Sequence, residues 1–255
     1  MKYLISVIVL VIGMTVISQA STRSDVKVLE ASENIKYLVQ EMAKDYMLLY
    51  TNTNNQNRKN AYTKIASKIE EIEKNIRIIA FATKNPKIKR ILDFFAYEKE
   101  YLKSNIEKDP NRIRVSKILD SSDAITEGAE KIALLTQYNS SFEEKMFMTM
   151  KRIVFLIEKI SKYYIVLGSN IDKVTIVERM NQSIKELDGE FEKIKQYNYP
   201  DTFNPRKKDL FDLWHFSKKY YQEISVLKIP SIVLLSGKGI ENIVNDIAIY
   251  HSKNQ

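Results

Sequence analysis

The stretch YTKIASKIEEIEKNIRII, residues 62–79, carries the clearest structural signal in the chain. Its apolar residues recur at intervals of three and four, which is the spacing of one face of an α-helix. The same spacing returns in VERMNQSIKELDGEFEKI, residues 177–194, and every equivalent position of the stripe is again apolar. A helical pattern that occurs twice predicts a duplicated helical module.

Three further blocks repeat in the same order along the chain. The paired blocks begin at Ile35 and Ile153, at Asn85 and Asn204, and at Ser116 and Ser231. Each copy therefore predicts four amphipathic helices, and an up-and-down four-helix bundle is the simplest way to bury four apolar stripes. We expect an all-α protein with two tandem up-and-down four-helix bundles, over residues 21–137 and 143–255.

The connection between the copies leaves two alternatives open. Residues 137–142 contain neither glycine nor proline, so the last helix of the first copy can run on into the first helix of the second. A single longer bundle with swapped helices also satisfies the apolar periodicity. All five prolines fall between stripes or at a first helical turn, so none breaks an expected helix.

Composition agrees with helices and narrows the function. Six glycines and five prolines in 255 residues are few for a sandwich, a barrel or an α/β fold, while 44% hydrophobic residues suffice for packed cores. The absence of cysteine excludes disulfides, thiolate zinc sites and a cysteine nucleophile, and the two histidines, His215 and His251, are too few for a histidine-built metal centre. We expect no enzyme activity, no catalytic residue, no metal ion and no cofactor.

The N-terminus has the pattern of a secretory signal peptide. Met1 and Lys2 precede an apolar run over residues 3–17, and Ser18-Gln19-Ala20 supplies small residues at the cleavage positions. A membrane anchor is the alternative, but the run is shorter than the roughly 20 residues that a spanning helix needs. We expect cleavage after Ala20, a processed chain that does not span the membrane, and a periplasmic location in a bacterium with two membranes.

The net charge of +8 does not indicate a nucleic-acid-binding protein. The basic residues alternate with 32 acidic ones, as they do on solvated helix faces, and an exported protein does not meet nucleic acid in the cell. The densest basic runs, residues 84–90 and 206–208, lie in equivalent loops, where solvated charge is the preferred interpretation.

Several single residues also have two interpretations. Lys44 and Lys162 hold equivalent positions in the repeats. The preferred interpretation is that each lies on the flank of its helix with its ammonium group in water, although contact with a ligand or an interface would also explain them. Helical spacing predicts that Trp214 and the aromatic residues near it are core residues, and that His215 lies at the surface. The core positions expected from this block are Trp214, Phe216, Tyr220 and Tyr221.

The run LVQEMAKDYMLL, residues 38–49, resembles the first helix of the PilJ-type domain. This is the N-terminal sensory domain of type IV pilus methyl-accepting chemotaxis transducers, which is related to the periplasmic domain of nitrate and nitrite sensor kinases. The Leu-x-Gln-x-Met-Ala-Lys motif of that family is matched by Leu38, Gln40, Met42, Ala43 and Lys44. The resemblance implies two tandem sensory domains that bind a ligand through their first helices.

The chain departs from the family where the nitrate sensors hold their anion. There an arginine approaches its symmetry mate across a dimer, whereas here Lys36 takes that position, with Val154 in the second copy and Arg152 two residues before it. Glu33, one turn away from Lys36, works against an anion. The candidate ligand-binding residues are Lys36, Gln40, Lys44, Arg152 and Lys162.

These patterns together predict a non-enzymatic periplasmic protein of the sensory or ligand-binding class. It would take a small ligand, with an anion among the candidates, and would act through a separate envelope protein, because the chain ends after the second copy. A homodimer is left open. The alternative is a structural or adaptor protein of the cell envelope that binds another protein through exposed helix faces.

Overall fold

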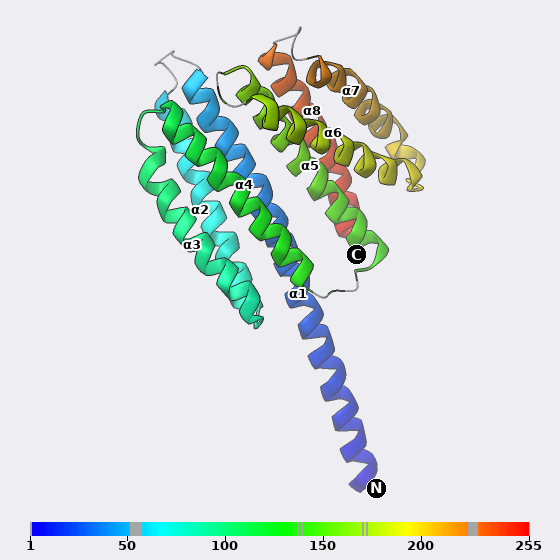
Figure 1. The fold of residues 1–255 in the computed structure, drawn as a ribbon. Helices are drawn as coiled ribbons and strands as arrows, with labels where there is room; N and C mark the ends of the chain where they lie inside the picture. Colours follow the sequence, from blue (N-terminus) through cyan, green and yellow to red (C-terminus); the bar gives the residue numbers. More distant parts are fainter. Residues whose placement is uncertain are drawn as a thin grey trace.

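The computed structural model describes residues 2–51, 58–136, 138, 140–169, 171, 173–223 and 229–254. Over these residues the chain is helical and contains no strand, as expected for an all-α protein (Figure 1). The α-helices are α1 (Lys2–Thr51), α2 (Arg58–Ala82), α3 (Pro86–Ile106), α4 (Arg112–Leu135), α5 (Phe142–Leu167), α6 (Lys173–Gln196), α7 (Asn204–Gln222) and α8 (Pro230–Lys253), and a short 3₁₀ helix, η2 (Asp201–Phe203), precedes α7.

Local capping signals set several of the helix starts. Asn85 accepts a hydrogen bond from the backbone N–H of Lys87 at 2.9 Å just before α3. Ser141 and Glu144 form a reciprocal capping box at the start of α5, in which each side chain accepts a hydrogen bond from the other residue's backbone N–H. These short polar segments therefore end one helix and begin the next.

The helices pack in two sets of four, α1–α4 and α5–α8. In the first set α1 contacts α2 and α4, and α3 contacts the same two helices. In the second set α5 contacts α6 and α8, and α7 contacts α8 and, less extensively, α6. The two sets meet where α1 packs against α5, so the first helices of the two sequence repeats lie side by side (Figure 1). We call this contact the α1–α5 seam.

Apolar stripes from both repeats face the core. Each Å² of apolar surface that is removed from water stabilises the folded state by about 25 cal/mol, and this free energy favours packing the stripes together. The fully or nearly fully buried equivalent pairs are Ile35 and Ile153, Met42 and Ile160, Tyr46 and Tyr164, Ile65 and Met180, Ile72 and Leu187, and Ile79 and Ile194. The expectation that the repeated stripes are core positions is confirmed for these pairs.

Helix α7 corrects one core assignment. Its buried residues are Leu210, Trp214, Ser217 and Tyr221, whereas Phe216 is 46% exposed. A helix turns by about 100° per residue, so Phe216, two residues after Trp214, points away from the face that Trp214 buries. His215 is exposed, as expected.

The two sets do not share a continuous helix. Helix α4 ends at Leu135, and Thr136 adopts an extended conformation with φ −91° and ψ 103°. The next helix begins only at Phe142, after the Ser141 cap. The connection that would have joined the copies through one long helix is therefore absent, and Gln137 and Asn139 lie outside the described residues.

Helix α1 runs without interruption past Ala20, the expected cleavage position. Figure 1 shows its N-terminal part extending beyond the other helices. Among the residues whose side chains the structure describes, no helix is both long and apolar enough to cross a membrane. Cleavage after Ala20 remains a prediction.

Candidate functional site

The α1–α5 seam and the helices beside it bury an unusual number of charged and polar side chains. Removing a charge from water is unfavourable unless a partner compensates it, so each such side chain needs a counter-charge or a hydrogen bond. The buried members are Glu33, Lys36, Gln40, Thr126, Glu158, Lys162 and Glu241. Four of the five predicted ligand-binding residues, Lys36, Gln40, Lys44 and Lys162, belong to this region.

Lys44 joins α1 to α5. Its Nζ lies 2.7 Å from Glu158 Oε1 and 2.6 Å from Oε2, and its side chain is only 12% exposed. Burial lowers the pKa of Lys44, but Glu158, Asp45 and Glu241 together raise it more, so the net shift is upward. The lysine is therefore an interhelix partner rather than a flank residue with a solvated head.

Lys162, its equivalent in the second repeat, joins α5 to α4. Its fully buried Nζ lies 2.6 Å from Asp123 Oδ1 and 3.2 Å from Ser122 Oγ, and Arg179 of α6 pairs with the other oxygen of Asp123. Burial lowers the pKa of Lys162 in spite of the Asp123 charge. Burial alone would raise the pKa of Asp123, but Lys162 and Arg179 lower it below its ordinary value.

The two equivalent lysines thus act reciprocally. Lys44 extends from the first set to Glu158 in the second, and Lys162 extends from the second set to Asp123 in the first. Each set provides a cation that the other set neutralises. The solvated position favoured by the sequence is wrong for both residues, because interhelix packing places their heads inside the molecule.

Gln40 and Glu158 hold equivalent positions in the repeats, and so do Thr126 and Glu241. In the first set Gln40 Nε2 donates a hydrogen bond to Thr126 Oγ1 at 2.7 Å. In the second set two acids replace this neutral pair. Burial raises the pKa of Glu158 to about 8, with Lys44 opposing the rise and Glu241 adding to it. The Glu158 carboxyl therefore holds its proton to a higher pH than an exposed glutamate does.

Lys36 lies at the position that corresponds to the family's arginine. Its Nζ pairs with Glu33 Oε1 at 2.6 Å, one turn earlier on α1, and lies 4.9 Å from the ring centroid of Phe155 on α5. The second carboxylate oxygen of Glu33, Oε2, is buried and has no hydrogen-bond partner within the described part of the chain. The cation is thus held between an acid and an aromatic face.

Arg152, the fifth predicted residue, lies outside the seam. It pairs with two acids of α6, at 2.9 Å from Glu186 Oε2 and 3.3 Å from Glu190 Oε1. The structure therefore does not bring the five predicted residues to one place. Gln40, Lys44 and Lys162 are engaged inside the helix packing, whereas Lys36 and Arg152 line the same cleft.

This cleft, which we call the charged cleft, lies among α1, α4, α5 and α6 and has a volume of about 600 Å³. Its basic lining residues are Lys36, Arg152, Lys159 and Arg179. Its acidic lining residues are Glu33, Asp123, Glu127, Glu130 and Glu186. Side chains of both signs from both sets of helices therefore face one space, which has the size of a small-molecule site.

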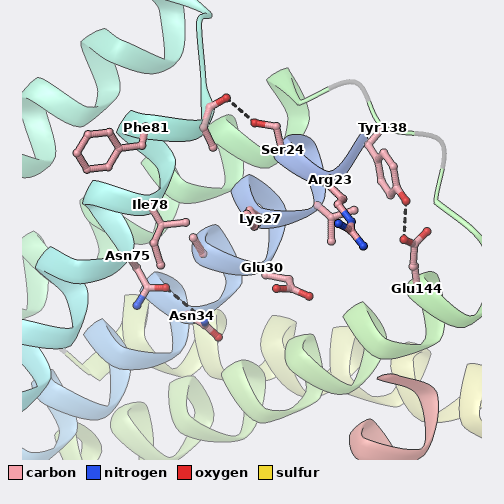
Figure 2. A pocket seen from close by; sticks show the side chains of 13 residues that line it. Arg23, Ser24, Lys27, Glu30, Asn34, Asn75, Ile78, Phe81, Tyr138 and Glu144 are labelled. Carbon is pink, nitrogen blue, oxygen red and sulfur yellow. Dashed lines mark hydrogen bonds between the residues drawn. The ribbon is translucent and has the colours of Figure 1, made fainter. Parts of the chain in front are cut away.

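A larger groove, of about 1160 Å³, lies beside the N-terminal part of the packed region (Figure 2). Its polar groups largely bond to one another: Asn34 Nδ2 donates to Asn75 Oδ1 at 3.3 Å, and Ser24 Oγ donates to the carbonyl of Ala82 at 2.7 Å. Figure 2 also shows Tyr138 pointing to Glu144. None of the five predicted residues lines this groove, and its hydrogen bonds tie α1 to α2, so we assign it a structural role.

The sequence interpretation missed the acids that hold the lysines. Asp123, Glu158 and Glu241 are not marked by any motif, although acids that replace Gln40 and Thr126 in the second repeat were a visible signal. His251 was also missed: its Nδ1 lies 2.6 Å from Glu143 Oε2 and its Nε2 lies 2.9 Å from the Tyr199 hydroxyl. No group of His, Cys, Asp and Glu among the described residues could hold a metal ion.

Neither family models, nor curated proteins, nor solved structures give a match to this chain.

Proposed function

We propose that the protein is a non-enzymatic periplasmic sensory or ligand-binding protein that binds a small ligand in the charged cleft and acts through a separate partner. The observation that supports this function is the position of the cleft. Its walls come from α1 and α4 of one set and from α5 and α6 of the other. A ligand that contacts both walls favours one arrangement of the two sets, which is the physical basis of a sensor.

We further propose that each set is one up-and-down four-helix bundle, so that the chain holds two tandem PilJ-like modules. The neighbour contacts of the helices and the burial of equivalent apolar pairs support this proposal. Small-molecule sites commonly lie between bundle helices.

The PilJ resemblance also fits the arrangement of the first helices. The repeats present α1 and α5 to each other within one chain, as two copies of a single-module protein would in a dimer. Lys36, at the position of the family's arginine, faces Phe155 across this contact. Arg152 enters the same cleft from the second repeat.

A thermal-shift series tests the function. The full chain is heated with a panel of small anions, sugars and amino acids, and a ligand selective for the folded state raises Tm saturably; at about 100 times Kd it adds about 2.7 kcal/mol. Lys36→Ala and Arg152→Ala should weaken the effect of the active compound. Lys131→Ala, on the exposed face of α4 outside the cleft, is the matched control.

An adaptor of the cell envelope is the second candidate. Large apolar side chains on three different helices favour it, because Phe81 is 90%, Leu134 84% and Leu235 76% exposed. If no compound of the panel raises Tm while one periplasmic protein co-purifies in stoichiometric amount, the adaptor function replaces the ligand-binding one.

A further inference from the structure

We propose that the charged cleft binds a small zwitterion, a molecule that carries both an ammonium group and a carboxylate, such as a free amino acid. This inference rests on the proposed ligand-binding function and names the ligand class for the same site. It is carried by the acids without an ion pair that α4 contributes to the cleft and the base without an ion pair that α5 contributes, among the described residues.

The acidic wall belongs to α4 and α1. Glu127 and Glu130 are three residues apart on α4, both line the cleft, and within the described chain neither forms an ion pair. Glu33 of α1 also lines the cleft and is 92% buried; its Oε1 pairs with Lys36, while its Oε2 lacks a hydrogen-bond donor within the described chain. This side of the cleft therefore offers carboxylate oxygens without a partner, which suit a ligand ammonium.

The basic wall belongs to α5. Lys159 lines the cleft and, over the residues that the structure describes, has no carboxylate partner; its Nζ lies 5.5 Å from the centroid of the Phe155 ring. Arg152 of α5 and Arg179 of α6 also line the cleft and pair with acids. Lys159 interacts electrostatically with Asp123 but forms no ion pair of its own within the described residues, so it can bind a ligand carboxylate.

The charge balance argues against simpler ligands. Four basic and five acidic side chains line the cleft, so a lone anion meets repulsion from Glu127 and Glu130, and a lone cation meets it from Lys159. An apolar ligand would desolvate these charges without compensating them. A zwitterion supplies a counter-charge to each wall, and a cleft of about 600 Å³ is large enough for an amino acid.

Titration calorimetry on the full chain tests the proposal. The probes are glycine, L-alanine, L-glutamate and L-lysine, each compared with its N-acetyl form, which lacks the ammonium, and its amide, which lacks the carboxylate; nitrate and glucose complete the set. We expect at least one free amino acid to bind, and both blocked forms of it to bind at least tenfold more weakly.

Two variants assign the ends of the ligand to the walls. Lys159→Met should weaken binding of the free amino acid about tenfold but leave the affinity for its amide nearly unchanged, because the amide has already lost the carboxylate. Glu130→Gln should weaken binding of the free amino acid about tenfold but leave the affinity for its N-acetyl form nearly unchanged, because that form has already lost the ammonium. Both side chains are half-buried rather than core residues, and exposed Lys131→Met and Glu178→Gln are the matched controls.

The outcomes separate this inference from the function on which it rests. If nitrate or glucose binds the cleft and no amino acid does, the proposal of a zwitterionic ligand is wrong while the ligand-binding function stands. Equal affinity for the free and blocked amino acids also contradicts the proposal of a zwitterionic ligand. If no compound in this set or in the thermal-shift panel binds, both proposals fail.

Discussion

The buried carboxyl of Glu158 should make the protein less stable as the pH rises through neutrality. Burial raises the pKa of Glu158 from its ordinary value of 4.5 to about 8, so between these values the native state holds a proton that the unfolded chain has released. The free energy of unfolding then decreases with increasing pH. The stabilising contribution is complete below about pH 4.5 and is lost as the pH passes through about 8.

The size of the effect follows from the same values. One extra bound proton changes the free energy of unfolding by about 1.4 kcal/mol for each pH unit, which gives an upper bound of about 5 kcal/mol over this interval. Lys44 next to Glu158 and Glu241 near it share the titration, so we expect about half of that bound, on the order of 2 kcal/mol.

Glu241→Gln tests the contribution that the second carboxyl adds to the effect of burial. The variant removes the second carboxylate from the pair, so the pKa of Glu158 should fall and the pH dependence between about pH 5 and about pH 9 should become clearly shallower. Lys238, which pairs with Glu241 at 3.1 Å, is 63% exposed, and water can solvate it in the variant at little cost. Glu178→Gln removes an exposed acid of α6 and serves as the control.

The assay is urea unfolding followed by far-ultraviolet circular dichroism, in buffers of constant ionic strength. Comparing the native chain with the variant cancels the contributions of other titrating groups. A native chain whose stability rises or stays level over this range would refute the reasoning, and so would an unchanged slope in Glu241→Gln.

Two further changes test the packing and the buried ion pairs. Gly128→Ala would place a Cβ 2.5 Å from Phe95 Cε1, so we expect the free energy of unfolding, measured in urea, to fall by about 1–3 kcal/mol. In the control, Gly189→Ala, the new Cβ meets nothing within 4 Å and should stabilise α6 by up to about 1 kcal/mol. Equal effects of the two substitutions would contradict the close approach of α3 and α4. Lys162→Met removes the buried cation that pairs with Asp123 and leaves only the more exposed Arg179, so stability should fall by about 3 kcal/mol. Asp123→Asn in the same chain should recover a large part of the loss, and simple additivity of the two changes would show that the pair is not coupled.

The helices could be predicted from the sequence because their signal is local. The spacing of Ile65, Ile69 and Ile72 indicates one buried face, and the repeated stripe marks the equivalent positions of the second half without any knowledge of neighbours. The exposed Phe216 shows the limit of this approach, since a cluster of aromatic residues does not state which of them faces inward.

The site was predicted only in part because ion pairing between helices depends on distances that no local pattern contains. Lys36 and Arg152 do line one cleft, as candidate ligand-binding residues should. No local sequence pattern, however, indicates that Lys44 pairs with Glu158, which lies on another helix more than a hundred positions away along the chain. Lys159, which forms no ion pair within the part of the chain that the structure describes, belongs to no motif. That property depends on its neighbours in space, which the sequence pattern does not contain.

The reciprocal lysines also bear on how the duplicated gene can change. If the chain were divided at the α4–α5 connection, the first half would keep Lys44 and lose Glu158, and the second would keep Lys162 and lose Asp123. Each fragment would expose or strand an ammonium ion in a nonpolar surface. We therefore expect each half alone to be less stable than in the intact chain, so that deletion of either copy carries a cost in stability.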